Sequence, residues 1–133
     1  MLSVVKSMSL QGLDGVLIDV EVDISSGMPC YDVVGLPDTN IRESKERVRT
    51  AIKNCEIELP SRKYIINLSP ANIRKDGAIL DLAIAVGILK SMGIINEINL
   101  HDVIFIGELS LDGKINKING ILPICVEPYK KRY

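Results

Sequence analysis

The apolar positions of this chain are densest over residues 78–89, where Asp81 is the only charged residue. Leucine, isoleucine, alanine and glycine recur there at helical spacing. The remaining faces are apolar as well, and a helix of that kind must be covered on most sides. We therefore expect a central buried helix over residues 76–93, with small residues that let its neighbours approach closely. The run is too short to span a bilayer, which needs about 20 apolar residues.

Alternation of apolar and polar residues predicts strands elsewhere. The clearest case is residues 16–24, where isoleucine and valine occupy the even positions and the acids Asp19, Glu21 and Asp23 lie between them. This alternation is typical of a strand with one buried face. Further strands are expected over residues 3–10, 31–34, 64–68 (a central one) and 103–107, with hairpin turns at 14–15 and 112–113.

The acidic residues of the 16–24 strand form a row on its polar face. Side chains two residues apart on a strand are about 6–7 Å apart, so a metal ion could in principle bind among Asp19, Glu21 and Asp23. No histidine or further carboxylate cluster in the sequence supports such a site. The row therefore favours a solvated strand face over a metal site.

A helix is expected after Pro37. Its apolar stripe consists of Ile41, Val48, Ala51, Ile52 and Cys55. Four basic residues share another face: Arg42, Lys45, Arg49 and Lys53. Two interpretations of this basic face stay open. It is either a solvated face with ion pairs to nearby glutamates, or a surface that contacts phosphate backbone or an acidic partner.

Asp81 is the one charged residue of the apolar helix. A carboxylate near a helix N-terminus is stabilised by the helix dipole. If it is also buried, it needs donors or a cation, because an unpaired buried charge is very costly. Arg74 and Lys75, just upstream, are the candidate partners. We favour structural pairing or capping over a catalytic role for Asp81.

Composition limits the class of protein. A chain of 133 residues is expected to form a single domain, 1–133, and its one Phe and absence of Trp predict an aliphatic core. A net charge of −1 argues against a strongly basic nucleic-acid binder but leaves room for local patches. The three cysteines form no CxxC pair, which is typical of free thiols in a reducing cytosol. The first residues do not resemble a signal peptide, so we expect a cytoplasmic protein without membrane contact.

The common catalytic and nucleotide-binding motifs are missing from the sequence. It contains no GxxxxGK[ST], no GxGxxG after a strand and no GxSxG, so we expect no cofactor. His101 is the only histidine, which argues against a His-dependent triad. Interleaved strands and helices, several linked by hairpins, predict an α+β two-layer fold, a mixed sheet with helices on one face.

Six stretches spread over nearly the whole chain form an ordered set. They are residues 7–15 (SMSLQGLDG), 33–38 (VVGLPD), 42–49 (RESKERVR), 67–75 (NLSPANIRK), 81–85 (DLAIA) and 105–113 (FIGELSLDG). Together they resemble the N-terminal domain of the ComM/YifB family, the magnesium-chelatase-like AAA+ ATPases of bacteria. The resemblance implies a ribosomal protein S5 domain 2-like fold, related to the proteolytic domain of Lon. We expect this domain to be truncated at its C-terminal end. The AAA+ ATPase module that follows it in the family, and that uses ATP and Mg, is expected to be absent.

Lon-like proteases carry a serine nucleophile at the start of the buried helix and a lysine after a later hairpin. The resemblance places Ile79 and Leu122 at these two positions. Isoleucine and leucine supply neither a hydroxyl nor an amine, so the resemblance implies a domain that is not an enzyme.

The resemblance also implies a role. The chain would be a non-catalytic accessory domain that assists DNA processing, such as branch migration during competence, in a homo-oligomeric ring beside its own AAA+ domain. The expected contacts with DNA or a neighbouring subunit are Arg42, Lys45, Arg49, Lys53, Arg74 and Lys75. The alternative is a purely structural oligomerisation module. A residual hydrolase that uses Ser69, Asp81 or Lys75 is less favoured. Nothing in these residues supports metal insertion into tetrapyrroles, which the name of the family suggests.

Overall fold

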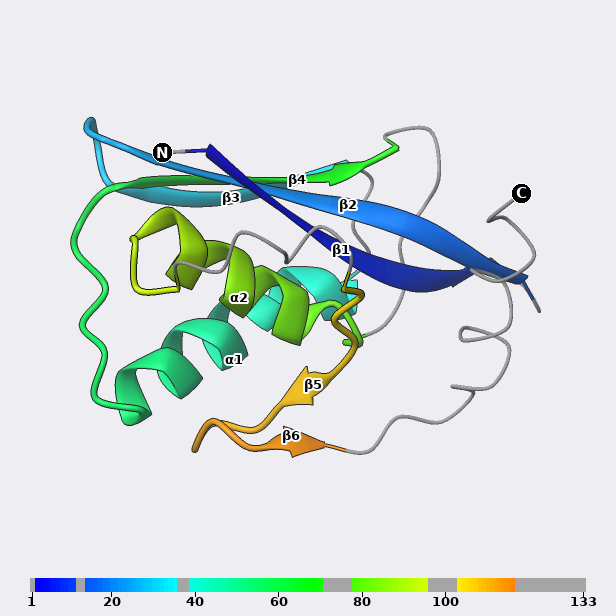
Figure 1. Ribbon diagram of the computed structural model, residues 1–133. Coiled ribbons are helices and arrows are strands. Elements are labelled where there is room, and N and C mark those ends of the chain that lie inside the picture. The colour runs from blue at the N-terminus through cyan, green and yellow to red at the C-terminus, as the bar shows by residue number, and fades with distance from the viewer. Residues whose placement is uncertain (1, 12–13, 36–38, 71–77, 96–102, 117–133) are drawn as a thin grey trace.

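A four-stranded mixed sheet and two helices form the two layers of the fold, as the computed structural model shows (Figure 1). The structure describes residues 2–11, 14–35, 39–70, 78–95 and 103–116. Both helices and a small two-stranded hairpin lie on the same side of the sheet, whose strand order is β1-β2-β4-β3. The predicted two-layer α+β class with a mixed sheet is therefore confirmed.

The first two strands form a long antiparallel hairpin. β1 spans Leu2–Gln11 and β2 spans Asp14–Ser25, and their pairing runs from Leu2↔Asp23 to Gln11↔Asp14. The turn predicted at 14–15 is wrong, because Asp14 and Gly15 pair with Gln11 and Leu10 and so belong to the β2 ladder. The even positions of β2 from residue 18 to 24 are buried, as the alternation predicted.

β4, Lys63–Ser69, is an internal strand of the sheet. It pairs antiparallel with β2 and parallel with β3, Cys30–Val34. Its inward side chains, Tyr64, Ile66 and Leu68, are buried against the helices. The predicted central position of this strand is confirmed.

Two helices cover the inner face of the sheet. α1 spans Thr39–Asn54 and buries Ile41, Val48, Ala51 and Ile52, as its stripe predicted. Cys55 is exposed, because the helix ends one residue before it. α2 spans Asp81–Ser91, so it begins later than expected, and a turn over residues 78–80 precedes it.

α2 packs very closely on β1 and β2. A Cβ atom at Gly87 would lie 2.6 Å from Cγ2 of Val22, which confirms that a small residue lets the helix approach the sheet. Serine hydroxyl groups also form hydrogen bonds between α2 and these strands. Ser3 Oγ donates to the Gly87 carbonyl at 2.8 Å, and Ser91 Oγ donates to the Val22 carbonyl at 3.0 Å.

The strand predicted over 103–107 does not form. Residue 104 makes one isolated parallel bridge to Lys6 at the edge of β1, and Phe105 donates its N–H to the Lys6 carbonyl at 2.9 Å. The chain then leaves the sheet, because Gly107 forms backbone hydrogen bonds with the start of α2 and the turn before it. The Gly107 N–H donates to the Ile79 carbonyl at 2.9 Å, and the Leu82 N–H donates to the Gly107 carbonyl at 3.0 Å. β5, Glu108–Leu109, and β6, Ile115–Asn116, form the hairpin predicted around residues 112–113.

Some of the residues and elements considered in the sequence lie outside the described part of the chain. This applies to His101, Leu122 and Cys125, the last of the three cysteines. Neither of the two described helices, α1 and α2, could span a lipid bilayer.

We expect Gly87→Ala to destabilise the protein. Alanine is normally favoured over glycine inside a helix by about 1 kcal/mol. Here the added methyl group overlaps Val22, and overpacking of this kind costs about 1–3 kcal/mol. Urea unfolding monitored by circular dichroism measures the change. In a Val22→Ala background the same substitution should become neutral or stabilising. An equal loss in both backgrounds would contradict the proposed contact.

Candidate functional site

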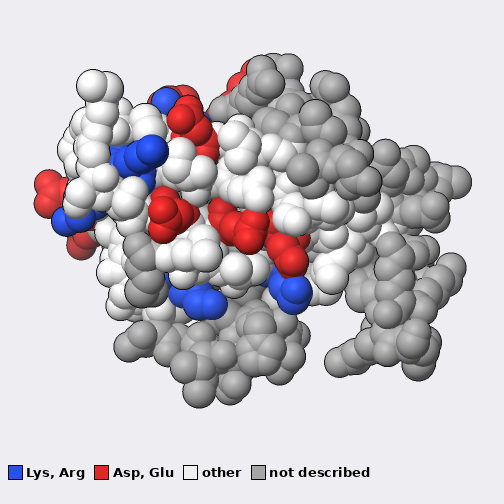
Figure 2. All heavy atoms as spheres, turned by 90° about the horizontal axis from the view of Figure 1, so that it is seen from above, with Lys and Arg blue, Asp and Glu red and all other residues white. Residues whose placement is uncertain are grey.

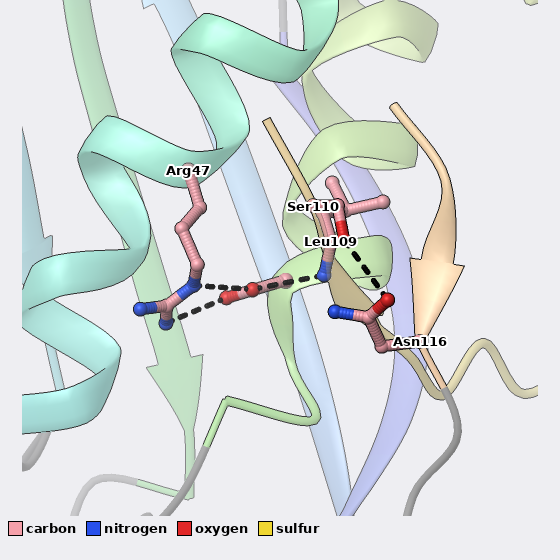
Figure 3. A network of polar contacts seen from close by, with 5 residues as sticks. Arg47, Leu109, Ser110 and Asn116 are labelled. Atoms are coloured by element: carbon pink, nitrogen blue, oxygen red, sulfur yellow. Dashed lines mark hydrogen bonds and ion pairs between the residues drawn. The ribbon is translucent and has the colours of Figure 1, made fainter. Parts of the chain in front are cut away.

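The first residue of α2, Asp81, is the centre of a buried polar network (Figure 3). Its side chain is 0% exposed. Arg47 of α1 donates Nε–H to Oδ2 at 2.7 Å and Nη2–H to Oδ1 at 3.2 Å, and the backbone N–H of Leu109 donates to Oδ2 at 3.1 Å. We call these three residues the Asp81 network. It joins α1, α2 and β5 at one carboxylate.

The electrostatics of the Asp81 network follow from burial and pairing. Burial raises the pKa of the Asp81 carboxyl above its usual value, while the Arg47 guanidinium and the Leu109 amide act in the opposite direction by stabilising the carboxylate. Hydrogen bonding to Asp81 raises the pKa of Arg47. The bidentate geometry uses both carboxylate oxygens, so Asp81 has no oxygen directed at solvent.

The sequence did not identify the partner of Asp81. The candidates Arg74 and Lys75 lie outside the described residues; among the described ones, the cation that pairs with Asp81 is Arg47. The one signal for this partner in the sequence was the position of Arg47 in α1. Arg47 directly precedes Val48 and lies four residues before Ala51, so it borders the buried stripe of α1.

Ile79, which the resemblance places at the position of the Lon nucleophile, lies in the turn before α2. Its side chain is partly buried and packs against the core. Its carbonyl accepts the Gly107 N–H at 2.9 Å. Leu122, which the resemblance places at the position of the Lon lysine, lies outside the described residues.

The β5–β6 hairpin is held against the end of α1. Asn54 Nδ2 donates to the Leu111 carbonyl at 2.7 Å. Within the hairpin, the Ser110 hydroxyl donates a hydrogen bond to Oδ1 of Asn116 at 2.9 Å (Figure 3). Gly113 has φ +93°, and a Cβ there would lie 2.6 Å from Sγ of Cys55. A glycine is therefore required at this turn.

Lys45, Arg49 and Lys53 form a line along α1, which we call the basic row; the side chain of Arg42 lies outside the described part of the chain. Lys45 Nζ lies 5.7 Å and Arg49 Cζ 5.9 Å from the centre of the Tyr31 ring, within the range of cation–π contacts. The basic row therefore borders β3, which carries Tyr31.

Beside the basic row is an open surface hollow of about 410 Å³. It is lined by Glu46, Arg49, Thr50, Lys53, Glu58 and Leu59. Its charges are two acids and two bases. The hollow is thus not a uniformly positive cleft of the kind that phosphates favour.

Acidic side chains gather at the middle of the outer face of the sheet, with Lys and Arg side chains around them (Figure 2). Asp19, Glu21 and Asp23 of β2, which we call the acidic row, project from this face, and red side chains cross its middle in the figure. Lys6 pairs with Asp19 at 2.7 Å, and Asn67 Nδ2 donates to Glu21 at 2.6 Å. Among the described residues, no group of histidine, cysteine or acidic side chains is arranged to hold a metal ion.

Comparison with known proteins relates the chain to one family. Residues 20–133 match the family described as subunit ChlI of Mg-chelatase. The chain belongs to this family. It is 33% identical to the competence protein ComM of Haemophilus influenzae and 37% identical to YifB of Escherichia coli, over 98% and 97% of its length. The predicted relationship to ComM and YifB is thereby confirmed.

A third relative is an uncharacterised protein of Mycobacterium tuberculosis, 39% identical over 88% of this chain. The alignments cover 26% of ComM, 26% of YifB and 23% of the mycobacterial protein. The chain therefore spans about a quarter of the length of the curated relatives it matches.

Removal of either member of the buried ion pair should destabilise the fold strongly. We expect Arg47→Met to lower the free energy of unfolding by about 3–5 kcal/mol, because it removes the guanidinium that pairs with the buried Asp81 carboxylate. Denaturant unfolding measures the loss. Lys6→Met is the matched control at the partly exposed Lys6–Asp19 pair and should cost about 0–1 kcal/mol. Similar losses for both variants would contradict the special role of the buried pair.

Proposed function

We propose that this chain is a non-catalytic accessory domain of a magnesium-chelatase-like AAA+ ATPase, with a ribosomal protein S5 domain 2-like, Lon-like fold. The observation that carries the proposal is the start of α2. There a partly buried isoleucine, Ile79, stands where the resemblance places a nucleophile, and both oxygens of Asp81 are engaged by Arg47. Membership of the Mg-chelatase family and the quarter-length matches to its relatives support the assignment to one part of a larger protein.

The remaining parts of this proposal follow from the family. ATP and Mg would bind to an AAA+ module and not to this domain. The partners would be that module and further copies of the chain in a ring, in the cytoplasm. ComM is named a competence protein, which supports a role of this chain in the processing of DNA.

The basic row is the DNA contact that the described residues favour. It presents three cations, Lys45, Arg49 and Lys53, at one edge of the helix layer. The exposed acids Glu43 and Glu46 and the acidic outer face of the sheet weaken this interpretation, because they repel phosphate. They favour the second candidate function, an oligomerisation module that meets another protein surface through the same row.

We expect no hydrolase activity from the chain. It should not cleave peptide substrates or react with a serine-directed fluorophosphonate probe, because its helix start offers no hydroxyl at Ile79 and no exposed carboxylate at Asp81. Labelling followed by intact mass spectrometry measures this. Turnover or labelling that disappears in Ser69→Ala would overturn the non-catalytic assignment.

A DNA contact through the basic row predicts salt-sensitive binding. In fluorescence-anisotropy titrations with single-stranded and branched DNA, Arg49→Glu/Lys53→Glu should weaken binding. It should also reduce the slope of log K against log salt, by about 0.7 per lost contact on single strands and about 0.9 on duplex. Lys114→Glu, an exposed hairpin substitution, is the matched control and should leave binding unchanged. No salt-sensitive binding by this chain or by the full-length protein would remove DNA from the proposal.

A further inference from the structure

The acidic row and the basic row have nearly the same spacing. Residues two apart on a strand are separated by about 6.8 Å, so the carboxylates of Asp19, Glu21 and Asp23 repeat at that interval along β2. Residues four apart on a helix are separated by about 6 Å along the axis, so the cations of the basic row repeat at that interval along α1. Three acids can therefore lie opposite three bases when a helix is aligned with a strand.

The two rows lie on opposite layers of the domain. The acidic row projects from the outer face of the sheet, while α1 lies on the other side (Figures 1 and 2). The rows cannot meet within one chain. A contact between them requires two molecules and uses different surfaces on each, which is the head-to-tail arrangement that generates rings or filaments.

The outer face of the sheet keeps an excess of negative charge. Asp32 of β3 adds to it, because Asp32 and Asp23 both pair with Ile65 and so share this face. Lys6 pairs with Asp19, and the Asn67 amide that binds Glu21 is neutral. Among the described strand residues of this face, four acids (Asp19, Glu21, Asp23 and Asp32) outnumber two lysines (Lys6 and Lys63). The face is thus complementary to a row of cations.

Apolar side chains flank the acidic row. Val4 and Leu17 on the same face are 37% and 40% exposed, and Val34 of β3 is 45% exposed. Exposed aliphatic groups beside charges are the composition of a protein–protein contact, in which apolar area is buried and the charges fix the register. DNA would offer nothing apolar of this kind to the sheet.

We propose that the acidic row of one copy binds the basic row of a second copy, with α1 of the second copy aligned along β2 of the first. This inference deepens the proposed accessory role, on which it rests, by naming the partner and both surfaces. The two surfaces also carry a second set of opposite charges. The acidic row has Lys6 and Lys63 beside it, and the basic row has Glu43 and Glu46 beside it.

Charge reversal on each surface tests the contact. Sedimentation velocity over a range of concentrations is measured for the wild type, for Arg49→Glu/Lys53→Glu and for Glu21→Lys/Asp23→Lys. The wild type should self-associate at about 0.01 M salt and dissociate at about 1 M salt, where the Debye length is about 3 Å. Each variant alone should associate about tenfold or more weakly, because like charges then face each other.

Mixing the two variants gives the decisive result. The reversed helix row of one variant is complementary to the reversed sheet row of the other, and their unchanged surfaces are complementary as well. An equimolar mixture should therefore recover association in a strictly alternating assembly. The hairpin variants Lys114→Glu and Asp112→Lys carry the same types of reversal and should associate like the wild type. Circular dichroism checks that all variants are folded.

Three outcomes would overturn the inference. They are a wild type that stays monomeric at low salt, a mixture that does not recover association, and a sheet variant that associates normally. If Arg49→Glu/Lys53→Glu loses DNA binding but keeps wild-type association, the basic row is a DNA surface and the self-contact is wrong. None of these association measurements tests whether the chain is a hydrolase. The self-contact can therefore fail while the non-catalytic accessory role stands, and the reverse also holds.

Discussion

A carboxylate without access to water must have its charge compensated, and in this protein the requirement at Asp81 fixes the position of three segments. Arg47 reaches it from α1, and the amide of Leu109 reaches it from β5. Each of these groups belongs to an element that could not satisfy Asp81 alone. Arg47 and Asp81 are 34 residues apart in sequence, and Leu109 belongs to a third element. The packing of the two helices and the docking of the hairpin therefore depend on the same carboxylate.

The sheet provides the second constraint on the same helix. Gly87 brings α2 against Val22, and the hydroxyls of Ser3 and Ser91 satisfy backbone carbonyls at that contact. α2 is therefore held from both sides, by an aliphatic and hydroxyl contact with the sheet and by an ionic contact with α1. At the start of α2, Asp81 connects this helix to α1 and to β5.

The hydrophobic repeat of each strand or helix predicted which of its own residues are buried. The alternation in β2 gave the correct buried positions, and so did the stripe of α1 apart from Cys55, which lies just beyond the end of the helix. Each face is determined by the element's own repeat. Tertiary contacts decided the rest. Asp14 and Gly15 extend a ladder because Leu10 and Gln11 pair with them. Residues 103–107 are apolar enough for a strand, yet Gly107 bonds to the turn before α2. The partner of Asp81 could not be read from spacing, because Arg47 also fits an ordinary ion pair within α1.

The separation of charge between the two layers is a consequence of the same periodicities. A strand buried on one face must place all its polar residues on the other, so the acids of β2 gather on the outer face of the sheet. A helix that buries one stripe must expose its cations elsewhere, and the basic row lies at the border with β3. Neither row is needed to satisfy the core, since the buried charge belongs to Asp81 and Arg47. Charges that stability does not require can be arranged for recognition. Their similar spacing and opposite charge are explained more directly by a second copy of this chain than by a nucleic acid, which could contact only one of the two rows.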